Sequence, residues 1–180
     1  GDAACRALLA ERRIRYLARY DALTKVPNRM QFQHLLQQAI ARALRSKHAL
    51  AMLYIDMDHF KEINDTFGHA AGDRALEILA ERLQQTVPKD TVIGRLAGDE
   101  FALFIEGLPV DEDNRGTVAQ FARKLLADIG RAFQVANQEV YLTGSVGIAI
   151  CPRDATNVSG IIRNADAAMY HAKQNGGNSF

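Results

Sequence analysis

The stretch Arg95-Leu96-Ala97-Gly98-Asp99-Glu100-Phe101 decides the fold that we expect, because it is typical of the tip of a β-hairpin. The residues on either side, 91–94 and 101–105, are rich in β-branched and apolar side chains, as strands are. At the tip, two small residues let a bulky ligand approach the backbone, and Gly98 can take positive φ without steric cost. The two acids that follow repel each other unless a cation or solvent separates them. Most such tetrapeptides are solvated turns, so a function for this one needs a second observation.

A second acidic cluster lies about forty residues upstream. The apolar run 49–55 predicts a buried strand, and it ends in Asp56-Met57-Asp58. Because side chains alternate along a strand, Asp56 and Asp58 share one face. With Asp99 and Glu100 they make four carboxylates, and hard oxygen ligands without paired His or Cys suit Mg²⁺ or Mn²⁺ shared with substrate phosphates. The alternative is that these acids close two surface turns.

Three polar residues after Asp56-Met57-Asp58 suit a nucleotide. Lys61 can meet phosphate as a point charge. Asn64 and Asp73 offer the mixed donors and acceptors that a guanine edge needs. The alternative is a solvated lysine and two helix caps. Neither GxxxxGK[ST] nor GxGxxG occurs in the chain, so no glycine-rich phosphate motif is present.

Composition limits the class of protein. A chain of 180 residues with 48% hydrophobic side chains predicts one domain with a substantial core. The net charge of +1, without a basic stripe, argues against a nucleic-acid polymer as partner. Cys5 and Cys151 show no zinc spacing and suit reduced thiols in the cytoplasm. No apolar run is long enough to span a bilayer. Because the chain begins without Met, we expect an excised cytoplasmic piece whose parent protein can be membrane-anchored.

Periodicity and turn residues predict an interspersed α+β architecture. We expect a connector helix at 2–19, and an acidic turn at 111–114. The predicted core helices are 29–45 (with Asn28 as N-cap), 59–67, 70–85, 118–130 and 160–174. The predicted strands are 49–55, 91–94, 101–105 and 133–135. After a turn at 136–138, we expect one further strand from 139 to 150. The pair Gly144 and Gly147 is interpreted as a site of close packing within that last strand.

Taken in order, these blocks resemble the GGDEF domains, the diguanylate cyclases, from about Asp21 onward. The resemblance is carried by Asp21-Ala22-Leu23-Thr24, Pro27-Asn28-Arg29, Asp56-Met57-Asp58-His59-Phe60-Lys61, Asn64-Asp65, Gly68-His69, Gly72-Asp73, the signature at 95–101, Gly144-Ser145-Val146-Gly147-Ile148-Ala149, Ala165-Asp166, Ala168-Met169-Tyr170 and Ala172-Lys173. It implies an α/β sandwich similar to the palm of nucleotide cyclases, with a mixed, largely antiparallel central sheet of about five strands and a hairpin carrying the signature. It also implies a connector at 1–20 and a GGDEF domain at 21–180.

The resemblance implies a reaction and a set of site residues. Two GTP molecules, one on each domain of a homodimer, would be condensed into cyclic di-GMP and two pyrophosphates with Mg²⁺ or Mn²⁺. Asp56, the Met57 carbonyl, Asp99 and Glu100 would form the metal site, and Asp99 and Glu100 would also be catalytic, acting on the attacking 3′-hydroxyl. The residues assigned to GTP are Asn64 and Asp73 (guanine), Leu23 and Leu76 (its pocket), Lys61 and Lys173 (phosphates), and Phe60, His69, Ala97 and Gly98.

Three departures from the family pattern bear on activity. The first Gly of the signature is Ala97, which could intrude on GTP or strain the backbone. The Arg that commonly follows Lys173 by four residues is Gly177 here, so one phosphate contact is missing. The family's product-inhibition RxxD falls on Pro88 and Thr91, which predicts no such feedback site.

A second function stays open beside the cyclase. The chain can be a GTP-binding regulatory module with little catalysis, fused to a sensor domain or to a cyclic di-GMP phosphodiesterase of the EAL type. The end of the chain, at 173–178, resembles the ends of GGDEF domains in such tandem proteins. A purely structural dimerisation domain would need vestigial acids, and the completeness of the acidic set argues against it.

Overall fold

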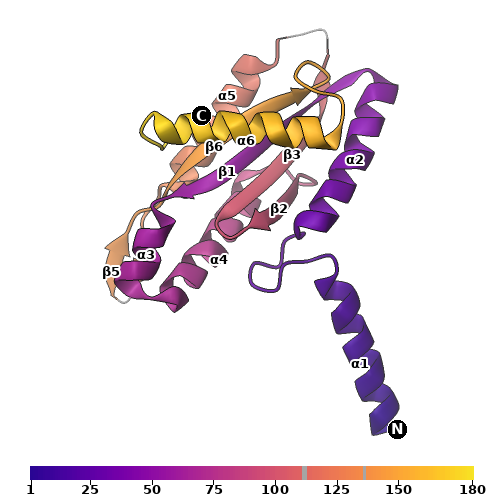
Figure 1. Ribbon diagram of the computed structural model, residues 1–180, viewed down its shortest axis with the longest axis vertical. Helices are drawn as coiled ribbons and strands as arrows, with labels where there is room; N and C mark the ends of the chain where they lie inside the picture. Colours follow the sequence, from indigo (N-terminus) through magenta and orange to yellow (C-terminus); the bar gives the residue numbers. More distant parts are fainter. Residues whose placement is uncertain (111–112, 136) are drawn as a thin grey trace.

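The computed structural model describes residues 1–110, 113–135 and 137–180 (Figure 1). Its helices are α1 (Asp2–Leu17), α2 (Arg29–Ser46), α3 (Phe60–Phe67), α4 (His69–Thr86), α5 (Arg115–Ile129) and α6 (Val158–Gln174). Its strands are β1 (His48–Asp58), β2 (Val92–Ala97), β3 (Glu100–Pro109), β4 (Phe133–Val135), β5 (Gln138–Val140) and β6 (Thr143–Cys151). Each predicted core helix is present, with ends shifted by up to three residues.

The central sheet has the strand order β2-β3-β1-β6, and each neighbouring pair is antiparallel. The α+β class is therefore confirmed, with four strands in this sheet where we expected about five. The strand expected from 139 to 150 is divided at Tyr141 and Leu142, because Leu142 is buried in the core while β5 pairs with β4 as a separate ribbon. Within the described residues, the parallel contribution is a single bridge between Ser145 and Ser179. Residues 111, 112 and 136, part of the predicted turns, lie outside the described residues.

Strand β1 is covered on both faces, which explains its nearly continuous apolar sequence. Leu50, Met52 and Tyr54 pack in the core cluster under α2 and α6. The alternate residues pack in the cluster formed with α4 and α5, and Figure 1 shows the two helix layers on opposite sides of the sheet. The same alternation continues past the apolar run, so Asp56 and Asp58 emerge on the α6 face.

Helix α6 lies directly on β6 at Gly147. A β-carbon at that position would overlap the Ala165 carbonyl oxygen and the Met169 backbone of the helix. The close packing predicted there is therefore observed, although for Gly144 the nearest atom to such a carbon would be at 3.5 Å. This contact sets the height of α6 above the sheet and, with it, the position of Lys173 near the helix end.

Helix α1 projects from the body and has no buried residue (Figure 1). Its connection to the domain is organised by Asn28, the predicted N-cap of α2. The Asn28 Oδ1 accepts from Gln31 N at 3.0 Å, its Nδ2 donates to the Leu17 carbonyl at 3.3 Å, and its backbone N donates to the Arg19 carbonyl at 2.8 Å. Asn28 thus contacts both the end of the connector and the first turn of α2, beside a bridge between Tyr20 and Pro27. A domain boundary near residue 20 stays a prediction. Among the described helices, none is both long and apolar enough to cross a bilayer.

Candidate active site

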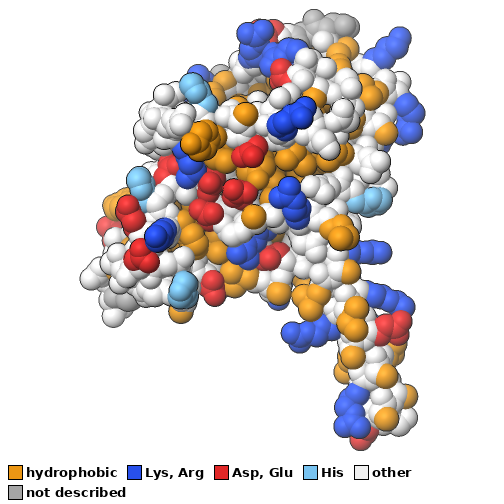
Figure 2. Space-filling view, viewed as in Figure 1, with side chains coloured by type: hydrophobic (Ala, Val, Ile, Leu, Met, Phe, Trp, Pro, Cys, Tyr) orange, Lys and Arg blue, Asp and Glu red, His pale blue; other side chains and the backbone are white. Residues whose placement is uncertain are grey.

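The two acidic clusters meet where the end of β1 lies beside the tip of the β2–β3 hairpin. In the β1–β3 register Asp56 stands opposite Glu100, and the Met57 backbone N donates to the Asp99 carbonyl at 3.4 Å. Figure 2 shows acidic side chains gathered on this face, next to apolar surface and beside α6. Clusters about forty residues apart in the chain are therefore neighbours, because β1 and β3 pair antiparallel.

Asp56 lies in an environment that disfavours its charge. Its side chain is 14% exposed, and its Oδ1 is buried without a hydrogen-bond partner in the described part of the chain. Burial, followed by the hydrogen-bonding contact and the charge of the Asp99 carboxyl group, raises the pKa of Asp56 to about 7, against the opposing effect of Lys173.

This donor set fits a hard divalent cation. Asp56 has one unsatisfied oxygen and lies beside the carboxyl group of Asp99, and the Met57 carbonyl shares the Lys173 ammonium group with Asp56. Mg²⁺ typically takes one or two carboxylates together with substrate phosphates. Within the described ranges, no three His, Cys, Asp or Glu side chains converge tightly enough to hold an ion by themselves. An ion here would therefore depend on the carbonyl and on phosphate oxygens.

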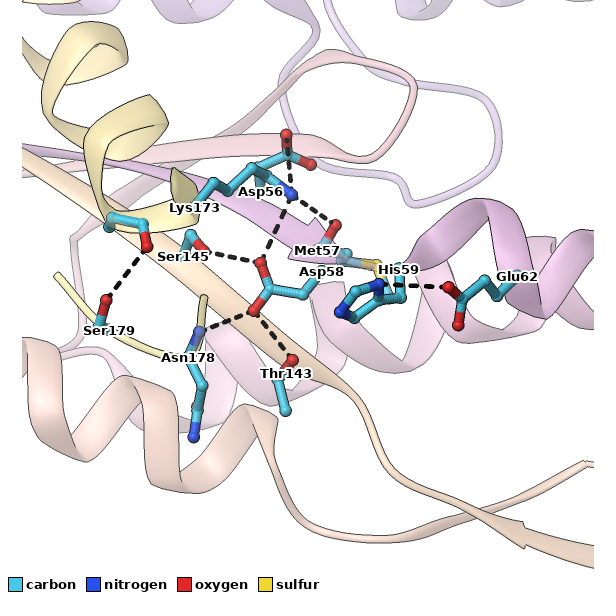
Figure 3. Close-up of polar contacts among 11 residues, drawn as sticks. Asp56, Met57, Asp58, His59, Glu62, Thr143, Ser145, Lys173, Asn178 and Ser179 are labelled. Carbon is cyan, nitrogen blue, oxygen red and sulfur yellow. Dashed lines mark hydrogen bonds and ion pairs between the residues drawn. The ribbon is translucent and has the colours of Figure 1, made fainter. Parts of the chain in front are cut away.

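Lys173 supplies the positive charge of the site (Figure 3). From α6, its Nζ donates to the Met57 carbonyl at 3.1 Å and lies 3.4 Å from Asp58 Oδ1 and 3.6 Å from Asp56 Oδ2. The ammonium group therefore contacts Asp56 and the Met57 carbonyl, which the family resemblance assigned to a metal.

Asp58 is committed to protein donors. It is 8% exposed and accepts from Thr143 Oγ1 at 2.9 Å, Ser145 Oγ at 2.7 Å and the Asn178 backbone N at 2.8 Å. Burial by itself would raise the pKa of Asp58, but these hydrogen bonds and Lys173 lower it below its ordinary value. Asp58, one of the four carboxylates considered for the metal, thus anchors β6 and the end of the chain. Nothing in the sequence indicated that Thr143, Ser145 and Asn178 would donate to it.

Glu100 is held by a residue that sequence reasoning missed. The Tyr54 hydroxyl donates to Glu100 Oε2 at 2.6 Å, and Tyr54 is 3% exposed. Burial and the adjacent Glu100 carboxylate raise the pKa of Tyr54, so the hydroxyl keeps its proton. In the sequence Tyr54 is one more apolar position of a buried strand.

The two residues assigned to the guanine edge lie on neighbouring helices, Asn64 on α3 and the exposed Asp73 on α4. The Asn64 side chain lies against α4, where a β-carbon at Gly72 would overlap its amide oxygen, and Asp73 is the next residue. Leu23 and Phe60 are half-buried at the edge of the core, whereas Leu76 is buried within it. Lys61 and His69 are exposed, and among the described residues the side chain of neither makes a hydrogen bond or an ion pair.

Comparison with known proteins identifies the family of the chain. The family model described as "Diguanylate cyclase, GGDEF domain" matches residues 18–179. The chain belongs to the GGDEF family. The bifunctional diguanylate cyclase/cyclic di-GMP phosphodiesterase MucR of Pseudomonas aeruginosa is 42% identical over 95% of this chain. The cyclic di-GMP phosphodiesterase PdeR of Escherichia coli is 34% identical, also over 95%.

The chain spans only part of these relatives, namely 24% of MucR and 25% of PdeR. Among solved structures, the coiled coil and GGDEF domain of DgcB from Caulobacter crescentus, in complex with c-di-GMP, has a TM-score of 0.82 and 25% identity. That likeness covers 99% of this chain and 92% of DgcB as crystallised.

Ala97, the variant position of the GGDEF signature, is in a backbone conformation that does not require glycine. Ala97 ends β2 and pairs with Glu100, and neither Ala97 nor Gly98 takes positive φ. The freedom predicted for Gly98 is thus not used, because the turn closes without it. A β-carbon at Gly98 would meet nothing within 4 Å, so the tip of this GGDEF hairpin borders open space.

The second departure, Gly177, has a structural reason. It takes a φ of +74°, and a β-carbon there would lie 2.6 Å from Asp58 Oδ2. The chain end is therefore closed tightly over Asp58 in this GGDEF domain, and an Arg at position 177 would have to displace that contact.

Proposed function

We propose that this domain is a diguanylate cyclase, which condenses two GTP molecules into cyclic di-GMP. The observation that carries the proposal is the juxtaposition of Asp56, the Met57 carbonyl and Asp99 with the Lys173 ammonium group beside them. Because these acids are buried and repel each other, a bound cation would stabilise their charged forms. A cation with a lysine beside it suits the negative charge of a triphosphate.

The chain's own groups have separate tasks in this proposal. Asp56, the Met57 carbonyl and Asp99 would hold Mg²⁺, with Glu100 at its edge. When bound, Mg²⁺ neutralises triphosphate charge and polarises the phosphorus under attack. Lys173 and Lys61 would contact phosphates.

The base and the signature turn complete the GTP site. Asn64 and Asp73 would read the guanine edge, with Leu23, Leu76 and Phe60 around the base and His69 nearby. Ala97 and Gly98 would let the nucleotide lie along the open tip of the hairpin.

Chemistry requires two domains facing each other. In each half-reaction the 3′-oxygen of one GTP forms a bond to the α-phosphorus of the other. The bond from that phosphorus to the bridging oxygen breaks and pyrophosphate leaves. Asp99 and Glu100 would orient the 3′-hydroxyl and accept its proton. Because one domain carries one GTP, we propose a homodimer as the active species, working in the cytoplasm where GTP is available.

The test is a chromatographic assay for cyclic di-GMP at high protein concentration with Mg²⁺ and GTP. Product from the wild type and none from Asp99→Ala would support the cyclase, and activity should rise steeply with protein concentration. If a forcibly dimerised domain makes no product at saturating Mg²⁺-GTP, the cyclase proposal is wrong.

A GTP-binding regulatory module is the second candidate, and the names of the relatives favour keeping it. MucR is named as both cyclase and phosphodiesterase, and PdeR as a phosphodiesterase, and the chain covers about a quarter of each. In this function GTP would bind without turnover and change the rate at which a fused EAL domain hydrolyses cyclic di-GMP. The domain could also pass on a signal from a fused sensor domain. GTP binding by calorimetry without product, together with GTP-dependent hydrolysis in the parent protein, would favour it.

A further inference from the structure

Tyr54 is a core residue with one polar atom, and that atom contacts the acidic cluster. Its ring packs in the cluster that contains Phe104, Leu96 and Ala102, and the residue is 3% exposed. A buried tyrosine hydroxyl ordinarily finds a hydrogen-bond partner. Here the partner is Glu100 Oε2, at 2.6 Å, which is the short distance typical of a hydroxyl bound to a carboxylate.

The strand register explains how Tyr54 reaches Glu100. Tyr54 and Asp56 are two residues apart on β1 and share a face, and Glu100 stands opposite Asp56 on β3. Tyr54 therefore reaches diagonally across the ladder, from the apolar end of the strand. In the described part of the chain, Tyr54 is the one group that hydrogen-bonds to the Glu100 side chain.

We propose that Tyr54 is a positioning residue, whose hydroxyl fixes Glu100 Oε2 so that the other carboxylate oxygen is presented to the metal and nucleotide. This inference rests on the proposed function of Glu100. A free glutamate side chain samples many rotamers, and ordering it during the reaction costs free energy. A partner built into the core orders it in advance, as supporting residues of functional sites do.

The experiment separates positioning from packing with four variants. Tyr54→Phe removes only the hydroxyl, and Tyr170→Phe is the matched control because Tyr170 is 60% exposed. Glu100→Gln and the double variant Tyr54→Phe/Glu100→Gln complete a double-mutant cycle. Mn²⁺ affinity is measured by electron paramagnetic resonance with α-thio-GTP, and kcat and KM are measured with Mg²⁺-GTP.

Positioning predicts a specific pattern. Tyr54→Phe should lower kcat by between about 10-fold and 100-fold with KM for GTP changed less than about twofold, since misplaced groups affect the reaction more than binding. It should also weaken Mn²⁺ binding severalfold, and this loss should disappear in the Glu100→Gln background. Tyr170→Phe should match the wild type, and all variants should melt near the wild-type temperature.

Two results would overturn the inference. Either Tyr54→Phe matches the wild type in kcat and Mn²⁺ affinity, or its Mn²⁺ loss persists in the Glu100→Gln background, which would mean a packing effect independent of Glu100. If the wild type itself makes no product, the cyclase proposal fails separately. The Mn²⁺ cycle then still decides on Tyr54, because coupling between the two substitutions supports positioning and its absence contradicts it.

Discussion

Asp21 and Arg95, 74 residues apart in the chain, form an ion pair with 3.1 Å between Arg95 Nη1 and Asp21 Oδ2. Thr24 donates to the same carboxylate from its backbone N and its hydroxyl, at 2.8 and 2.7 Å. Arg95 also donates from Nε to the Gly98 carbonyl at 2.9 Å. One guanidinium group therefore joins the segment after α1 to the turn of the signature hairpin.

We expect Arg95→Lys to destabilise the domain and slow turnover. Lysine keeps the charge but cannot reach two acceptors with a planar fork, so either the Asp21 or the Gly98 contact is lost, at about 1–3 kcal/mol. Urea unfolding and cyclic di-GMP assays measure the two effects. Arg42→Lys is the control, because the pair between Arg42 and Glu106 is exposed (49% and 39%) and such pairs contribute under about 1 kcal/mol. Equal losses in both variants would contradict this role of Arg95.

The raised pKa of Asp56 predicts that the stability of the metal-free domain falls as pH rises from about 4 to 7. Its pKa is about 7, above the ordinary 3.8, so the folded state binds more protons than the unfolded state between these values. Its contribution to stability is present below pH 4 and is lost as pH rises through 7. We expect Asp56→Asn to flatten this decline and to stabilise the domain at pH 8 by on the order of 1–3 kcal/mol, as measured by chemical unfolding without metal.

Asp58 is the matched control of opposite sign. Its pKa is lowered, so its contribution to stability is present above the ordinary pKa and is lost as pH falls through the folded-state value. Asp58→Asn should therefore destabilise the domain at pH 8. If both aspartate variants shift stability in the same direction, the assignment of their environments is wrong.

Lys173→Met should change metal and nucleotide binding in opposite directions. Without nucleotide, the Lys173 ammonium group occupies the surroundings of the Met57 carbonyl and Asp56, so its removal should raise Mn²⁺ affinity severalfold. GTP affinity should fall, because a phosphate contact is lost. Lys124→Met, on the exposed face of α5, should change neither quantity. Weaker Mn²⁺ binding by Lys173→Met without nucleotide would be inconsistent with this competition.

Gly177→Ala should destabilise the domain by about 1–3 kcal/mol, because it combines a left-handed φ with a collision at Asp58. Gly116→Ala is the comparison, since a β-carbon there meets nothing within 4 Å, and it should be neutral or up to about 1 kcal/mol stabilising. Thermal melting distinguishes the two. Gly177→Arg should not tighten GTP binding, because the new side chain can be accommodated only if the contacts of Asp58 with the end of the chain are lost.

Ala97→Gly should leave turnover within about twofold of the wild type, since Ala97 is a strand residue without positive φ and glycine relieves no strain there. The restored glycine should slightly destabilise the hairpin, by about 0.5–1 kcal/mol, through the greater freedom of the unfolded chain. A large gain in cyclic di-GMP production would mean that the methyl group obstructs GTP.

The sequence predicted those features that depend on local periodicity and on motifs. The hairpin at 95–101, the alternation that puts Asp56 and Asp58 on one face, and the N-cap at Asn28 all follow from residue order. The roles assigned to the site residues themselves stay predictions.

Features that depend on tertiary partners could not be predicted from the sequence. The commitment of Asp58 depends on Thr143 and Ser145, at separations of 85 and 87 residues. The hydroxyl of Tyr54 finds Glu100 only through the β1–β3 register. The division between β5 and β6 was missed because the apolar run continues through Leu142, which enters the core instead of the ladder.

Because Asn28 contacts both the end of α1 and the first turn of α2, helix α1 extends from the domain as a rigid arm. The helix has 16 residues, which at 1.5 Å per residue is an arm of about 24 Å. A tilt of about 10° at Asn28 would move the far end of α1 by about 4 Å, given that arm length. Conversely, a displacement of about 4 Å at the far end corresponds to a rotation of about 10° at the start of α2, given the same arm length. A movement at the far end of α1 would therefore reach the start of α2, through the contacts of Asn28, as a change in helix direction.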